Sequence, residues 1–135
     1  MTPQDIDRVR RSWLLIEPRR EEVGRLFYGR LFELQPATRA MFKGDMAAQA
    51  AKLMATLNVV VEHLDQLDAV LPAVRQLGLR HRREWQVSDA MYYWVRDALL
   101  WTLQRSLGEA FDGDMHVAWG QAYDRVAGPM KQAQR

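Results

Sequence analysis

The stretch VLPAVRQLGLRH, residues 70–81, decides how the rest of this chain is interpreted. Four of its side chains recur at spacings of three and four, which places them on one face of a helix: Val70, Val74, Leu77 and His81. The apolar face therefore carries an imidazole at its end. Burying an imidazole without a partner is costly, so His81 is either a core histidine bonded to a carbonyl or a metal ligand.

Helical spacing of apolar residues continues on both sides of this stretch. Strand-like alternation and internal repeats are absent from the sequence. We expect a first helix capped by Thr2 and ending near Pro18, then helical segments over 23–34, 36–42 and 49–64, one running to about His81, one from Ser88 to Gly108, and a last one after the turn 112–114 with a possible kink at Gly128-Pro129. The sequence therefore predicts an all-α fold of about seven helices.

Length and composition limit the classes of protein. The chain has 135 residues, of which 48% are hydrophobic, so we expect one domain over residues 1–135. The formal net charge of +2 does not suggest a nucleic-acid partner, and the lack of cysteine excludes disulfides and thiolate sites. The polar N-terminus resembles no signal peptide, and no apolar run is long enough to span a membrane. We expect a soluble cytoplasmic protein.

Two further polar side chains interrupt apolar faces. Gln49 begins the stripe that continues through Leu53 and Leu57, and Tyr28 lies in a strongly apolar helix. Taken alone, Gln49 suits a solvated rim and Tyr28 an ordinary core tyrosine. Together with His81 they describe one site, with an imidazole from one helix and two neutral hydrogen-bonding groups from two others. Apolar walls, an axial imidazole and distal donors are what an iron porphyrin needs.

Competing sites lack their sequence patterns. The chain has no His-Glu-x-x-His zinc motif, no glycine-rich phosphate loop, no Gly-x-Ser-x-Gly elbow and no paired Glu-x-x-His for a di-iron centre. The two remaining histidines, His63 and His116, are expected at the surface.

Three segments resemble a known family. Residues 26–32 (LFYGRLF) with Pro36 and Met41-Phe42, residues 71–81, and residues 118–123 (AWGQAY) are similar to bacterial globins. These are the single-domain haemoglobins of the Vitreoscilla and Hell's Gate globin types and the globin domain of flavohaemoglobins. The resemblance runs from about Asp5 to Met130 and implies a globin fold around a pocket for haem b, iron protoporphyrin IX.

The resemblance also implies a role for each matching residue. His81 matches the proximal iron ligand, and Phe42 matches the phenylalanine that packs on the porphyrin. Tyr28, Gln49 and Leu53 match the distal residues. The other residues expected to contact haem are Leu57, Leu77 and Val95 as pocket walls, and Lys52 and Arg80 as partners of the propionates.

The chain departs from the family pattern on the proximal side. About one extra residue separates His81 from the pair Tyr92-Tyr93, so either tyrosine can be the one beside the proximal histidine. The glutamate that buttresses this histidine in flavohaemoglobins is matched by Gln134. Loss of that carboxylate implies a less peroxidase-like proximal side.

The resemblance implies three functions for a haem-loaded chain. One is reversible binding of O2, and of NO or CO, in oxygen transport or scavenging. A second is a nitric oxide dioxygenase that converts NO to nitrate and depends on a separate reductase. A third is a gas sensor. The alternative without any of these functions is a helical bundle that binds no haem. The sequence leaves open whether the protein is a monomer or a homodimer.

Overall fold

A computed structural model describes residues 1–85 and 87–134, and these contain helices but no strands. The α-helices are α1 (Pro3–Ile16), α2 (Arg20–Leu34), α3 (Met46–Glu62), α4 (Leu67–Trp85), α5 (Asp89–Leu107) and α6 (Gly113–Ala133), with short 3-10 segments η1 (Glu17–Arg19), η2 (Pro36–Met41) and η3 (Gly108–Ala110) between them. The prediction of an all-α fold is confirmed. The segment that begins at Pro36, expected as one of the seven helices, is a 3-10 helix. The last helix, α6, continues through Pro129.

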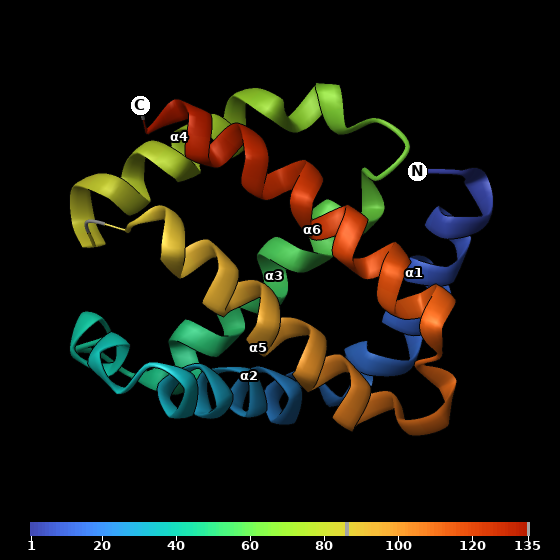
Figure 1. Ribbon diagram of the computed structural model, residues 1–135, viewed down its shortest axis with the longest axis horizontal. Coiled ribbons are helices and arrows are strands. Elements are labelled where there is room, and N and C mark those ends of the chain that lie inside the picture. The colour runs from blue at the N-terminus through green and yellow to red at the C-terminus, as the bar shows by residue number, and fades with distance from the viewer. Residues whose placement is uncertain (86, 135) are drawn as a thin grey trace.

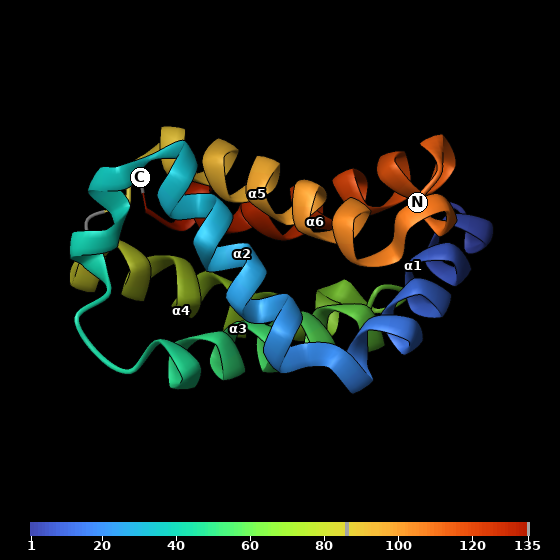
Figure 2. The same cartoon turned by 90° about the horizontal axis from the view of Figure 1, so that it is seen from below.

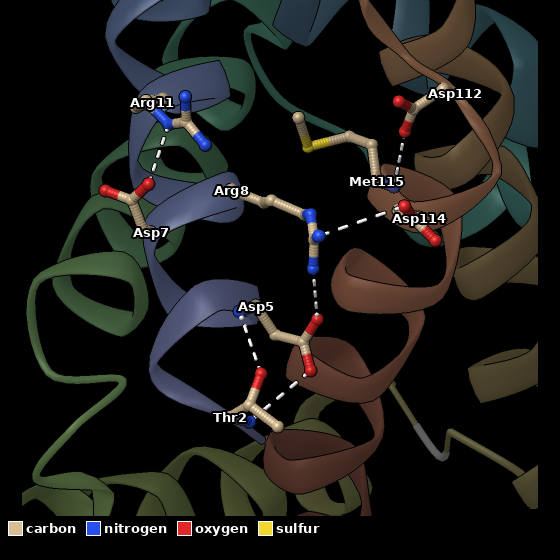
Figure 3. A network of polar contacts seen from close by, with 8 residues as sticks. All are labelled: Thr2, Asp5, Asp7, Arg8, Arg11, Asp112, Asp114 and Met115. Carbon is tan, nitrogen blue, oxygen red and sulfur yellow. Dashed lines mark hydrogen bonds and ion pairs between the residues drawn. The ribbon is translucent and has the colours of Figure 1, made fainter.

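Side-chain caps fix where several helices begin. Thr2 and Asp5 form a reciprocal capping box at the start of α1, and Asp112 accepts a hydrogen bond from a backbone N–H in the first turn of α6. Arg8 then joins the two helix starts, because its guanidinium lies 3.0 Å from the Asp5 carboxylate and 3.8 Å from that of Asp114 (Figure 3). The turn expected at residues 112–114 is thus the cap and first turn of α6.

The helices pack in two groups. α2 lies against both α5 and α3, whereas α4 packs chiefly against α6 (Figures 1 and 2). The buried apolar side chains also form two clusters, a large one that draws on all six α-helices, with Leu67 as the contribution of α4, and a small one made of Val74, Tyr92, Ala127 and Met130. Hydrophobic cores of small domains are usually one contiguous cluster. Here Val70 of α4 packs against both clusters, and the core is divided beyond it, where Val74 belongs to the small cluster alone.

No described helix combines the length and the apolar run needed to cross a bilayer.

The contact between α4 and α6 depends on a glycine. A Cβ atom on Gly78 would lie 2.6 Å from the carbonyl oxygen of Met130 and 2.8 Å from its Cα, closer than real contacts of this kind. The obstacle is backbone, which cannot rotate away as a side chain can. Gly78 therefore allows the two helix backbones to approach, at the cost of conformational entropy in the middle of a helix.

We expect Gly78→Ala to lower the free energy of unfolding by about 1–3 kcal/mol, because the added methyl group forces α4 and α6 apart. Gly29→Ala in α2 is the matched control, since a Cβ there meets no atom within 4 Å. The control should stabilise the protein by roughly 0.5–1 kcal/mol through its better helix propensity. Urea unfolding followed by circular dichroism measures both, and equal effects would contradict the close approach.

Candidate functional site

The two distal residues predicted from sequence lie together. Gln49 on α3 donates a hydrogen bond from Nε2 to the hydroxyl oxygen of Tyr28 on α2, at 3.4 Å. Tyr28 is buried, and this burial raises the pKa of its phenol. The hydroxyl is therefore neutral near pH 7, and its own proton is not used in the bond with Gln49. Tyr28 can donate that proton to a further acceptor.

Aromatic rings hold Tyr28 in position. Phe42 packs edge-on against the tyrosine ring at a centroid distance of 5.2 Å, and Phe27 does so at 5.0 Å. Phe32 contacts both Tyr28 and Phe42. Edge-to-face packing of this kind is favourable and restricts the tyrosine rotamer. Phe42, expected from sequence to pack on a porphyrin, thus borders the distal pair.

His81 is the imidazole that α4 carries on its inner face. The ring is half-buried, and its Nδ1 lies 2.8 Å from the carbonyl oxygen of Leu77. A carbonyl can only accept, so Nδ1 carries the proton and Nε2 carries the lone pair. Burial lowers the pKa of the imidazole, which favours its neutral form. A neutral histidine with Nδ1–H held by a carbonyl is the usual form of a metal-binding histidine.

A cavity of about 580 Å³ lies between the segment around Phe42 and Gln49 and the end of α4, and neither Tyr28 nor His81 is among the described residues that line it. Such a volume falls in the range of roughly 300–1,000 Å³ typical of cofactor sites. The lining combines two expected residues, Phe42 and Gln49, with Glu84, which lies three positions after His81. The remaining lining residues are Ala40, Met41, Lys43, Gly44, Asp45 and Met46. Residues 43–45 directly follow Phe42, and this position is the sequence signal that could have indicated their role in the lining.

The expected pocket walls are apolar side chains that the protein leaves partly uncovered. Phe42, Leu53, Leu57 and Val95 border the large core cluster, and Leu77 borders the small one. All five are half-buried. By contrast Lys52 and Arg80 are exposed and do not line the cavity, so their contact with propionates stays a prediction.

These residues fit a haem group. Half-buried apolar side chains on both parts of the divided core suit the faces of a flat macrocycle, and His81 offers one axial nitrogen. Within residues 1–85 and 87–134, no group of three or more His, Asp or Glu side chains could hold a metal ion by itself.

The structure distinguishes the two tyrosines of α5. Tyr92 is buried against the small cluster, whereas Tyr93 is 59% exposed. Nε2 of Gln134 donates to the Tyr92 hydroxyl oxygen at 2.6 Å and to the carbonyl oxygen of Gly78 at 3.2 Å. Arg82 also donates to the main-chain oxygen of Gln134. The residue matched to a buttressing glutamate thus contacts α4 on both sides of His81 in sequence.

The Gly78 carbonyl determines the orientation of the Gln134 amide. Because this oxygen can only accept, the amide must present its NH2 group to it, and the same group then donates to Tyr92. A glutamate carboxylate could not make either donation. Burial raises the pKa of Tyr92 to about 12, so the tyrosine stays neutral beside this amide.

Comparison with known proteins identifies relatives. The family model described as Globin matches residues 25–130. Neuroglobin-2 of Oncorhynchus mykiss is 27% identical over 96% of this chain and 90% of its own length. A flavohemoprotein of Halalkalibacterium halodurans is 30% identical over 79% of this chain, which corresponds to only 26% of that protein. The crystal structure of a hexacoordinated heme protein from an anhydrobiotic tardigrade covers the whole chain with a TM-score of 0.89 at 16% identity, a likeness in fold.

We expect Gln134→Glu to lower the free energy of unfolding by about 1–3 kcal/mol at pH 7, because a buried carboxylate faces the Gly78 carbonyl without a hydrogen to donate. Both burial and the facing carbonyl raise the pKa of the introduced carboxyl. Its protonated form can donate, so stability relative to the native chain should be best at acidic pH and fall as pH rises. Gln132→Glu, at an exposed position, is the control. A pH-independent difference in urea unfolding between Gln134→Glu and the native chain would contradict the assignment.

Proposed function

This chain belongs to the globin family, and we propose that it holds haem b through His81 and binds O2, NO or CO reversibly. The observations that carry the proposal are the cavity of about 580 Å³ lined by Phe42, Gln49 and Glu84, and the neutral imidazole of His81 three positions before Glu84 on α4. We further propose the bacterial single-domain type, supported by the Tyr28–Gln49 pair and by similarity to a flavohemoprotein. Oxygen binding or scavenging is then the primary function.

Haem iron supplies reversible binding of diatomic gases when it is held by one imidazole. The chain provides the rest through its own residues. His81 keeps Nε2 unprotonated because Nδ1–H is held by Leu77. On the distal side the Tyr28 hydroxyl donates to a ligand that accumulates negative charge, and Gln49 fixes the direction of that donation by occupying the tyrosine oxygen from the other side. The half-buried apolar walls limit competition from water.

The distal helices offer no imidazole. Neither α2 nor α3 contains a histidine, and His63 follows the end of α3, where its ring nitrogen contacts the carbonyl of Val59 at 2.8 Å. The tardigrade protein of similar fold is described as hexacoordinated. We propose that in this chain the distal position is instead left open to an external ligand.

Nitric oxide dioxygenation is the second candidate. Two neutral donors beside the ligand suit a reaction in which NO meets O2, and the relative described as a flavohemoprotein is much longer than this chain. Each turnover leaves ferric iron, so sustained activity requires electrons from a reductase. The same site would serve both functions, and only the supply of electrons separates them.

Absorption spectroscopy tests whether His81 holds haem. Purified protein loaded with haem should show a Soret band that shifts on reduction and again on adding O2 or CO. His81→Ala should lose or strongly alter this band, because His81 is the imidazole that the inner face of α4 offers to the iron. His116→Ala, at an exposed position, is the control and should leave the spectrum unchanged. A chain that takes up no haem would refute the proposal.

Ligand dissociation rates test whether Tyr28 donates a hydrogen bond to the bound ligand. Tyr28→Phe removes one hydrogen bond to the ligand, worth about 1–2 kcal/mol, so the O2 dissociation rate should rise roughly tenfold. The CO dissociation rate should change much less, because CO carries less negative charge. Flash photolysis and stopped-flow mixing measure these rates. An unchanged O2 dissociation rate in Tyr28→Phe would exclude Tyr28 as the donor.

The two candidate functions differ in turnover. With NADH and a reductase supplied, a dioxygenase should consume many equivalents of NO per haem and form nitrate in the same amount. A binding protein, whose ferric haem is re-reduced only slowly even with this supply, should consume about one equivalent of NO and then stop. An NO electrode together with a nitrate assay distinguishes these outcomes. Gln49→Leu should slow repeated NO consumption by a dioxygenase and leave the single-equivalent reaction of a binding protein unchanged.

A further inference from the structure

The face of α4 turned away from the core carries a row of arginines. Arg75, Leu79 and Arg83 follow one another at intervals of four residues, which places them on one side of the helix, and Arg80 flanks them. All four side chains are exposed, Leu79 at 38%. We call these four residues the α4 outer face. The core-facing side of the same helix carries Val74, Leu77 and His81.

The positive charge of the α4 outer face is not neutralised within the described part of the chain. Six other arginines form ion pairs there: Arg8, Arg10, Arg11, Arg19, Arg30 and Arg96. Arg75, Arg80 and Arg83 form none among the same residues. The acidic residues of α4 form no ion pair with these arginines among the described residues: Asp68 is in the first turn of the helix, and Glu84, four positions after Arg80, lines the cavity. Arg80 and Arg83, three positions apart, also repel each other.

The place of this face on α4 connects it to the haem site. Arg83 follows His81 by two residues, and a helix with its side chains is only about 10–12 Å across. The outer face is therefore a surface close to the proposed iron ligand. A protein that delivers electrons to this haem gains by docking where the distance to the iron is short.

We propose that the α4 outer face docks the acidic surface of an electron-donating protein. The inference rests on the proposed haem function, in which ferric iron must be re-reduced. In the complex one electron leaves the reduced cofactor of the donor and converts ferric iron to ferrous, and no covalent bond forms or breaks. Proteins that exchange electrons meet through small interfaces guided by charge. The α4 outer face, with three arginines around the side chain of Leu79, is a surface of this kind.

Two other occupants fit less well. A second copy of this chain would bring two positively charged faces together. A membrane-surface helix inserts a broad apolar face into the lipid, whereas the apolar side of α4 is packed against α6 and Leu79 is the only large exposed apolar side chain of its outer face. Charge complementarity therefore favours an acidic protein.

The test uses reduced flavodoxin, an acidic protein with an FMN cofactor, as the electron donor to haem-loaded ferric protein in a stopped-flow experiment. Arg75→Glu with Arg83→Glu should lower the second-order rate of haem reduction by about tenfold or more near 0.01 M ionic strength, where the Debye length is about 30 Å. Near 1 M salt, where that length is about 3 Å, the difference should disappear. Replacing the same two arginines with Gln should give a smaller fall.

Arg20→Glu with Arg25→Glu in α2 is the matched control, because it changes the net charge equally at an exposed place on another helix. It should lower the rate far less. Equal losses in the two pairs would mean that only total charge matters and would overturn the proposal. Dithionite reduces the haem without docking, and its rate should be the same in every variant.

A measurement without haem chemistry separates this inference from the proposed function. Oxidised flavodoxin should perturb the NMR signals of residues 75–83 in the haem-free protein, and the α4 pair should abolish this effect. Failure of the chain to take up haem would refute the proposed function and leave this binding measurable. Absence of binding, or binding of the α4 outer face to phosphatidylglycerol vesicles but not to flavodoxin, would overturn the docking proposal.

Discussion

The close approach of α4 to α6 at Gly78 is the constraint on which the site depends. With no Cβ between them, the backbone of Gly78 reaches that of Met130, and Gln134 continues the contact to the next turns of α4. One side of α4 is thereby closed against α6. The neighbouring side, which carries Leu77 and His81, is left turned toward the divided core. A third side of the helix, with Arg75 and Arg83, is exposed to solvent. One helix thus supplies the support, the ligand and the docking surface of the proposed site.

The distal side shows how two polar side chains are held together without charge on either of them. Tyr28 and Gln49 would each lose water by burial, and their mutual hydrogen bond offsets part of that cost. Both are neutral, since burial raises the pKa of the phenol rather than lowering it. A neutral donor pair suits a small neutral ligand that becomes partly negative on binding. A permanent charge at the same place would attract water and ions instead.

The proximal side follows the same principle with different residues. The amide of Gln134 contacts the Gly78 carbonyl and the Tyr92 hydroxyl, so the residue that supports α4 adds no charge near His81. Groups that surround and orient a ligating histidine tune how strongly it donates to a metal. An amide in place of a carboxylate is consistent with a chain that binds ligands reversibly more readily than it oxidises them. The amide differs from a carboxylate by one functional group, yet it donates to the Tyr92 hydroxyl oxygen, where a carboxylate could only accept.

The sequence by itself determined the helical class, the candidate imidazole on the face of Val74 and Leu77, and the identities of Tyr28 and Gln49, because these follow from spacing along one helix or from local motifs. Only the tertiary structure decided which side chains from different helices meet. It paired Tyr28 with Gln49, turned Tyr92 rather than Tyr93 inward, and brought Glu84 to the cavity of Phe42. It also converted the segment after Pro36 into a 3-10 turn. Contacts of this kind depend on how helices cross. The crossing is set by the packing of many side chains and by close backbone approaches such as that at Gly78. The periodicity of side chains within one helix does not determine it.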